Sequence, residues 1–155
     1  MKIIKAPSTI FLIPFEKAVF LAGSIEMGKA ENWQQKIEGK LSKCDGVIFN
    51  PRRDDWDSSW VQSIDNPQFR EQVEWELSAL EQSDIVVMYF DPATKSPISL
   101  LEFGLLAKTG KLIVCCPEGF WRKGNVDIVC RKYKIQQVNN LDSLIKCLCA
   151  KFSIA

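Results

Sequence analysis

The sequence predicts an α/β protein in which one parallel β-sheet lies between two layers of helices. Five short apolar runs are rich in Val, Ile and Phe and almost continuous, as in parallel strands that are buried on both faces. Segments whose apolar residues recur at helical spacing separate these runs. Such alternation implies right-handed crossovers and a three-layer architecture. A chain of 155 residues is long enough to bury a core as one domain.

The strand and helix candidates follow one another in a regular order. The predicted strands cover residues 18–22, 47–50, 85–90, 112–116 and, more weakly, 134–138. A short helix is expected over residues 126–132. Four further helices are marked by apolar residues at helical spacing: Trp33, Ile37 and Leu41; Phe69, Val73, Leu77 and Leu80; Ile98, Leu101, Leu105 and Leu106; and Leu141, Leu144, Ile145 and Leu148.

Two segments do not follow this alternation of strands and helices. Residues 1–16 are expected to form an N-terminal arm or an extra edge strand, and residues 17–155 a single domain. Residues 51–67 form a long polar loop, and loops of that length are usually functional or disordered. Trp56 and Trp60 in this loop favour an ordered conformation, in which they either stack on a nucleobase or pack against the sheet edge.

Composition excludes several classes of protein. The apolar and charged fractions, 46% and 25%, are those of an ordinary globular protein. A net charge of +1 gives no reason to expect a nucleic-acid partner, and no apolar run is long enough to span a membrane or to serve as a signal peptide. The six Cys residues follow no zinc-binding spacing, so we expect reduced thiols in a cytoplasmic protein.

The absence of histidine restricts the chemistry. A chain with no His has no Ser-His-Asp or Cys-His nucleophile system and lacks the commonest zinc ligand. Acid–base chemistry must therefore come chiefly from carboxylates. We expect no metal and no cofactor.

Ligands of open parallel sheets bind at the carboxyl ends of the strands. Gly23-Ser24 is such an end, and its backbone N–H groups either receive an anion or form a plain strand-to-helix turn. The segment from Asn50 to Asp55 follows the next strand. Asp91 follows the third, where it either caps a turn or contacts a ligand.

Two carboxylates fall at positions that should be buried. Glu76 lies at the edge of the expected apolar stripe of its helix, and Glu102 lies within the expected stripe of the next one. Ionised carboxylates rarely enter an apolar face unpaired, because desolvation costs several kcal/mol. Each is either paired with an Arg, shielded at a subunit contact, or part of a shared active site. Ser96-Pro97 is expected to cap and start the second of these helices.

Several of these residues together resemble a known family. Val19-Phe20-Leu21-Ala22-Gly23-Ser24-Ile25, a carboxylate in the second helix, and Ser96 followed by Leu101-Glu102-Phe103-Gly104 are similar to the nucleoside 2-deoxyribosyltransferases and the related deoxynucleoside 5′-monophosphate N-glycosidases. The resemblance implies a flavodoxin-like fold with a five-stranded parallel sheet in the order 2-1-3-4-5. It also implies a double displacement in which Glu102 attacks the sugar and the base leaves.

The resemblance also implies roles for individual residues. Glu102 and Glu76 are expected to be catalytic, Glu102 as an ionised nucleophile and Glu76 as the acid that holds or protonates the base. Phe20 replaces a Tyr of the family, and Glu26 replaces an Arg of the monophosphate hydrolase, which disfavours a 5′-phosphate unless Arg52 or Arg53 compensates. The expected substrate-binding residues are Phe20, Gly23, Ser24, Asn50, Arg52, Asp55, Trp56, Asp91, Ser96 and Asn125.

In the family a neighbouring subunit completes the site. We therefore expect a homo-oligomer, at least a dimer, with the 119–125 segment at the interface and Asn125 or Arg122 reaching the partner's site. The expected ligand is a nucleoside or nucleobase. Three functions stay open: transfer of a 2-deoxyribosyl group between bases, hydrolysis of an N-glycoside, and a nucleotide-sensing module without turnover.

Overall fold

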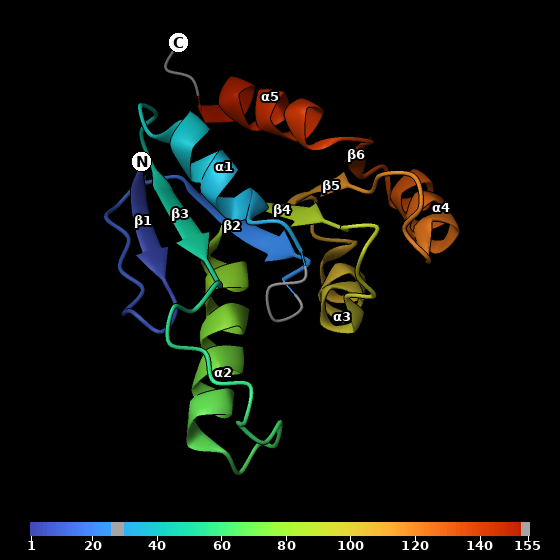
Figure 1. Cartoon of the computed structure of the whole chain (residues 1–155). Coiled ribbons are helices and arrows are strands. Elements are labelled where there is room, and N and C mark those ends of the chain that lie inside the picture. The colour runs from blue at the N-terminus through green and yellow to red at the C-terminus, as the bar shows by residue number, and fades with distance from the viewer. Residues whose placement is uncertain (26–29, 153–155) are drawn as a thin grey trace.

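A single parallel sheet of six strands forms the centre of the molecule (Figure 1). The computed structural model describes residues 1–25 and 30–152. Position 26, where the sequence suggested an effect on phosphate binding, lies outside the described residues. The strands are β1 (Lys2–Lys5), β2 (Ala18–Gly23), β3 (Val47–Asn50), β4 (Ile85–Tyr89), β5 (Leu112–Cys115) and β6 (Gln136–Val138). The helices are α1 (Trp33–Leu41), α2 (Pro67–Gln82), α3 (Pro97–Leu106), α4 (Lys123–Tyr133) and α5 (Leu141–Phe152).

The strand order is β1-β3-β2-β4-β5-β6, and every pairing is parallel. The five predicted strands are β2 to β6, and their predicted order is confirmed. The structure adds β1, which pairs with β3 at the sheet edge, so the predicted count of five strands was one too few. The fold is a flavodoxin-like three-layer α/β sandwich.

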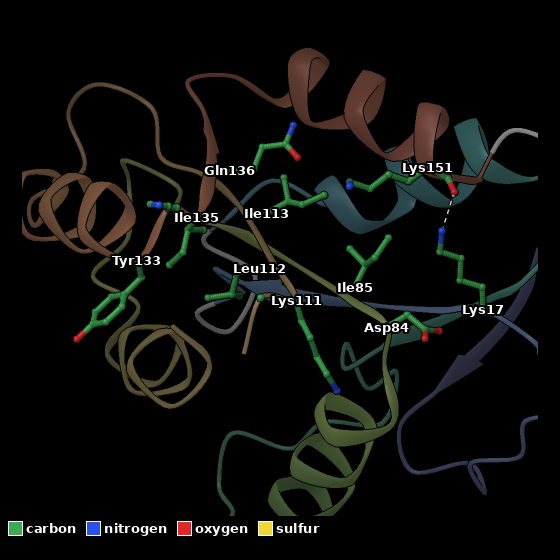
Figure 2. Close-up of a pocket in the computed structure, with 12 residues that line it drawn as sticks. Lys17, Asp84, Ile85, Lys111, Leu112, Ile113, Tyr133, Ile135, Gln136 and Lys151 are labelled. Atoms are coloured by element: carbon green, nitrogen blue, oxygen red, sulfur yellow. Dashed lines mark hydrogen bonds between the residues drawn. The ribbon is translucent and has the colours of Figure 1, made fainter. Parts of the chain in front are cut away.

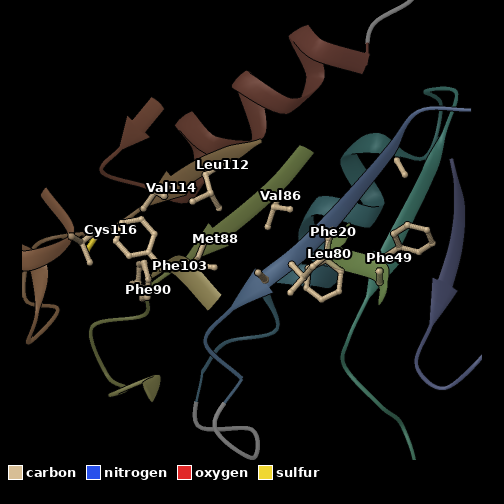
Figure 3. Packing of buried hydrophobic residues seen from close by; sticks show 14 of the residues in the cluster. Phe20, Phe49, Leu80, Val86, Met88, Phe90, Phe103, Leu112, Val114 and Cys116 are labelled. Atoms are coloured by element: carbon tan, nitrogen blue, oxygen red, sulfur yellow. The ribbon is translucent and has the colours of Figure 1, made fainter. Parts of the chain in front are cut away.

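Alternate residues of the central strands β2 to β5 point into two separate cores. Phe20 and Val86 face the layer of α2, α3 and α4, and Figure 3 shows this core, in which Phe90 and Phe103 also lie. Leu21 and Val87 face the layer of α1 and α5. Both faces of the central strands are thus buried, which explains why apolar residues do not alternate with polar ones along these strands.

The buried face of α2 differs from the predicted one. The sequence placed Phe69, Val73 and Leu77 on the core side, whereas Leu77 is exposed and the other two are only partly buried. The true face is rotated by ~100°, about one residue step around the helix. Its buried residues are Gln72, Trp75, Ala79 and Leu80. Two polar residues, Gln72 and Glu76, therefore face the sheet.

Helix α3 is apolar on two faces. Ile98, Leu101 and Leu105, the predicted core stripe, are each 60% or 61% exposed, so that prediction was wrong. The buried residues are instead Ser99, Glu102 and Phe103. Periodicity cannot choose between two apolar faces, because both fit the same 3.6-residue repeat. In the described part of the chain no helix has the length and apolarity needed to cross a membrane.

Candidate active site

Glu102 is a buried carboxylate without a partner. Its side chain points from the second turn of α3 toward the sheet, and the residue is 9% exposed. No hydrogen bond or ion pair to Glu102 is present among the described residues. Burial, and to a smaller degree the charge of Glu76, raises the pKa of Glu102 to about 8.

Glu76 is the second carboxylate, and it has a donor. Gln72, one turn earlier on α2, donates from Nε2 to Glu76 Oε1 at 2.8 Å and to the backbone oxygen of Pro51 at 2.9 Å. Burial raises the pKa of Glu76 to about 7, and the bond from Gln72 opposes that rise. The Gln72 amide therefore ties Glu76 to the chain that leaves the carboxyl end of β3.

The two carboxyl groups act as a pair. Glu76 contributes to the raised pKa of Glu102, so their charges interact across the space between α2 and α3. In the free protein near neutral pH such a pair retains a proton. The sequence led us to expect that Glu76 alone would hold that proton, whereas the pKa of Glu102 is raised at least as far. The hydrogen bond from Gln72 lowers the pKa of Glu76, whereas no described residue donates to Glu102 and the charge of Glu76 adds to the rise of its pKa.

Gly23 marks the point where β2 approaches β4 most closely. Its φ is +126°, and a Cβ atom there would lie 2.3 Å from the Tyr89 backbone oxygen. That oxygen accepts from the Ser24 N–H at 2.8 Å. Only glycine fits this turn, and the turn aims the Ser24 side chain along the carboxyl edge of the sheet.

A cluster of three hydroxyl groups lies at the same edge. Ser24 Oγ is 2.6 Å from Ser96 Oγ and 2.8 Å from Thr94 Oγ1, and Thr94 Oγ1 is 2.8 Å from Ser96 Oγ. Ser24 Oγ also accepts from the Asp91 N–H at 2.9 Å. Hydroxyls both donate and accept, so a ligand with either kind of group can replace one of these contacts.

Ser96 departs from its predicted role. It occupies the N-cap position of α3 with Pro97 following, as expected, but its side chain makes no capping hydrogen bond to the helix. Its φ of +46° is left-handed, which is uncommon for a residue with a side chain. This conformation directs the hydroxyl to Ser24 and Thr94.

Asp91 and Phe20 have structural contacts in the free protein. Asp91 Oδ1 accepts from the Ala93 N–H at 2.8 Å and its Oδ2 from the Glu31 N–H at 3.4 Å, which is the turn-capping alternative. Phe20 is buried, with its ring centroid 6.3 Å from that of Trp75 on α2. It packs beneath the helix that carries Glu76 and supplies no polar atom to the pair.

Asn50 and Arg52 are held together at the end of β3. Asn50 Oδ1 accepts from the Arg52 N–H at 2.9 Å, and Asn50 Nδ2 donates to Glu38 Oε1 at 2.7 Å. The Arg52 guanidinium reaches Gln34, the second residue of α1, with Nε and Nη2 at 3.4 and 3.3 Å from Gln34 Oε1. Arg52 thus lies over the sheet edge.

Among the described residues, the ion pair of Asp55 and the ring contact of Trp56 lie within their own loop. Asp55 is exposed and pairs with Arg53 at 2.7 Å. The Trp56 ring packs edge-on against Trp60, with centroids 5.1 Å apart, and Arg53 lies 5.0 Å from the Trp60 ring. These contacts order the loop, and the described structure shows no contact between them and the carboxylate pair.

Asn125 lies on the exposed side of the first turn of α4, a helix that begins three residues before the predicted one. Nearby, Trp121 donates from Nε1 to the Lys95 backbone oxygen at 2.9 Å. This bond joins the loop after β5 to the loop before α3. No described side-chain contact links Asn125 to Glu76 or Glu102 of the same chain.

A cavity of about 310 Å³ lies at the other end of the sheet (Figure 2). Lys17 donates to the Lys151 backbone oxygen at 2.9 Å, and Lys111 donates to the Glu81 backbone oxygen at 2.8 Å. These lysines stabilise the C-terminal ends of α5 and α2. The cavity borders the amino ends of the strands, away from the carboxylate pair.

Sequence reasoning missed three polar residues that shape the site. Gln72 went unnoticed because the predicted stripe of α2 was wrong, although its position four residues before Glu76 was a usable signal. Thr94 lacked a signal, since only the folded loop brings it to Ser24. Gln34 is fully buried inside α1, and its Nε2 atom has no hydrogen-bond partner in the described structure.

These features define a flavodoxin-like α/β protein with two interacting carboxyl groups, one buried and one partly buried, beside the carboxyl edge of its sheet. Among residues 1–25 and 30–152 no group of Cys, Asp and Glu side chains is arranged to hold a metal ion. The family model described as "Nucleoside 2-deoxyribosyltransferase like" matches residues 16–120, more than half of the chain. The chain therefore belongs to the nucleoside 2-deoxyribosyltransferase-like family. No curated protein matches it.

Proposed function

We propose that this protein cleaves an N-glycosidic bond of a 2-deoxyribonucleoside or its nucleotide and transfers the 2-deoxyribosyl group through a glycosyl-enzyme intermediate on Glu102. The observation that carries the proposal is the pair formed by Glu102, which is buried on α3, and Glu76, which is partly buried on α2, because the charge of Glu76 raises the pKa of Glu102. Membership of the family supports the reaction class.

The pair has the parts that a double displacement requires. A carboxylate oxygen of Glu102 forms a bond to the anomeric carbon while the bond from that carbon to the base nitrogen breaks. The electron pair goes to the base, which takes a proton from the Glu76 carboxyl group. In the second step an acceptor base attacks the anomeric carbon, Glu102 leaves as carboxylate, and the proton of the acceptor returns to Glu76.

Substrate binding must move the shared proton. In the free protein no described residue donates a hydrogen bond to Glu102, and its pKa is raised at least as far as that of Glu76. A sugar hydroxyl that donates to Glu102 would stabilise its ionised form, while the base draws the proton to Glu76. The reactive arrangement thus forms only around the ligand.

The test is incubation of the protein with a panel of 2′-deoxynucleosides and their monophosphates, with and without a second free base, followed by chromatography. Transfer predicts a new nucleoside that contains the added base. Free base and free sugar with no new nucleoside would indicate hydrolysis instead. No consumption of any substrate would refute the proposal.

We further propose a homo-oligomer that uses α3. Ile98, Leu101 and Leu105 form an exposed apolar strip on this helix, and Trp121 beside it is 47% exposed. Exposed apolar surface of this kind is typical of subunit contacts. Sedimentation at micromolar concentration is expected to show a dimer or larger species, and Leu101→Glu to shift it toward monomer. A monomer at all concentrations would contradict this expectation.

A further inference from the structure

We propose that Arg52 binds a phosphate group of the substrate, so that the site takes a nucleotide in preference to a nucleoside. This inference rests on the proposed function, because it names the substrate class of the same site.

Arg52 carries a charge that no carboxylate of the described residues neutralises. Its guanidinium contacts only the neutral Gln34 Oε1 atom, at 3.3 and 3.4 Å. It forms no salt bridge within the described chain, although the side chain is partly buried. Burial lowers its pKa, which means that the charged form is poorly solvated there. A half-buried cation of this kind gains most from an anionic partner.

The neighbouring arginine shows the opposite arrangement. Arg53 donates to Asp55 at 2.7 Å and to Glu71 at 3.0 Å. Its guanidinium also lies 5.0 Å from the Trp60 ring. The pKa of Arg53 is raised, first by the hydrogen bond to Asp55. Asp55 of the loop and Glu71 of α2 therefore neutralise Arg53, and neither forms a salt bridge with Arg52.

Arg52 is also fixed in place at the carboxyl edge of the sheet. The Arg52 backbone N–H donates to the Asn50 side chain, which in turn donates to the Glu38 carboxylate. The backbone oxygen of the preceding residue, Pro51, accepts a hydrogen bond from Gln72 Nε2, and the same Nε2 group also donates to Glu76. A two-bond link therefore connects the chain at Arg52 to the carboxylate pair. A ligand that touches both would lie along this edge, where open α/β sheets bind their ligands.

The chemistry of the free guanidinium edge favours phosphate. Nε and Nη2 are directed at Gln34, so the Nη1 group has no hydrogen-bond partner among the described residues. Paired N–H groups of a guanidinium match two phosphate oxygens. A nucleoside alone would leave the charge of Arg52 unneutralised, whereas a nucleoside monophosphate would neutralise it.

The experiment measures binding without turnover. The Glu102→Gln protein is titrated by calorimetry with a 2′-deoxynucleoside and with its 5′- and 3′-monophosphates. We expect at least one monophosphate to bind about tenfold to a hundredfold more tightly than the nucleoside, in line with charge-assisted hydrogen bonds. Adding Arg52→Gln should bring that ratio close to one. Arg52→Lys, which keeps the charge but loses the fork, should retain part of it. Inorganic phosphate should compete in the parent protein only.

Arg53→Gln is the matched control, because it removes the same charge one residue away. It should keep the preference for the monophosphate, and Arg70→Gln serves if Arg53→Gln does not fold. Equal binding of nucleoside and monophosphates, or a preference that survives Arg52→Gln, overturns the inference. The two proposals fail separately: a phosphate preference that depends on Arg52 without cleavage of any N-glycoside refutes only the proposed function.

Discussion

Glu76 on α2 and Glu102 on α3 are the same residue type, face the same sheet and are both withdrawn from water, but only one of them has a hydrogen-bond donor. Gln72 donates to Glu76, while no described group donates to Glu102. Their pKa values follow this difference, about 7 and about 8. The comparison shows that the α3 carboxylate is the less satisfied group in the free protein.

A poorly satisfied carboxylate is costly for the fold and useful for a reaction. Removing a carboxylate from water without compensation destabilises its charged form, which makes that form reactive toward an electron-poor carbon. In the proposed complex, a sugar hydroxyl of the substrate donates the hydrogen bond to Glu102 that no described residue donates.

The largest expected effect comes from removing the α3 carboxylate. Glu102→Ala should reduce turnover by about a thousandfold or more, the loss typical of a covalent catalyst. Steady-state rates with the best substrate of the panel measure this effect. Glu81→Ala, an exposed carboxylate at the end of α2, is the control and should keep full activity. Normal turnover by Glu102→Ala would remove Glu102 from the mechanism.

The second prediction concerns pH. Since Glu102 must be ionised to attack, kcat/KM of the free protein should rise with pH toward about 8. The Glu76 charge contributes to that raised pKa, so Glu76→Gln should move the rising limb to lower pH, while the rate falls for bases that are poor leaving groups. A rising limb at the same pH in both proteins would show that the two carboxyl groups are not coupled.

The third prediction concerns stability. The folded pKa of Glu102 lies above its ordinary value of 4.5, so the folded protein binds more protons between about pH 4.5 and 8. Stability should therefore fall as pH rises through that window, by up to about 1.4 kcal/mol per pH unit for one proton. Glu102→Gln should flatten this slope and be the more stable protein at pH 8.5. Urea denaturation at several pH values tests it, and parallel slopes would contradict it.

The smallest effect is expected from the donor to Glu76. Gln72→Leu removes the bond that opposes the raised pKa of Glu76 and leaves the Pro51 backbone oxygen without its partner. We expect a loss of about 1–3 kcal/mol in stability and a falling limb of kcat displaced to higher pH. Gln82→Leu, on the exposed end of the same helix, is the control. Unchanged pH profiles in Gln72→Leu would mean that Gln72 serves only to support the fold.

The sequence was sufficient for strands β2 to β6 and for singling out the two carboxylates. Near-continuous apolar runs identified β2 to β6 because those strands are buried on both faces. Strand β1 was less visible, since it lies at the edge and carries Lys2 and Lys5. Glu102 was singled out as a buried carboxylate, although the stripe used to place it is in fact exposed. When a helix has two apolar faces, the residue pattern does not show which of them is buried.

The details of the site depended on contacts between distant segments. The Ser24, Thr94 and Ser96 hydroxyls meet only after β2 and β4 have paired. The left-handed conformation of Ser96 has no local sequence signal comparable to a glycine. The different partners of Arg52 and Arg53 likewise depend on which side of the loop each side chain takes. Such choices are tertiary, so residue patterns along the chain cannot fix them.

Trapping the intermediate tests the central claim most directly. A 2-fluoro-2-deoxy nucleoside slows release of the sugar, and mass spectrometry of the digested protein then locates the adduct. We predict one added 2-fluoro-2-deoxysugar on the peptide that contains Glu102, and none in Glu102→Gln. An active protein whose adduct lies on another residue, or that turns over this substrate without any adduct, would contradict the assignment of Glu102 as the nucleophile.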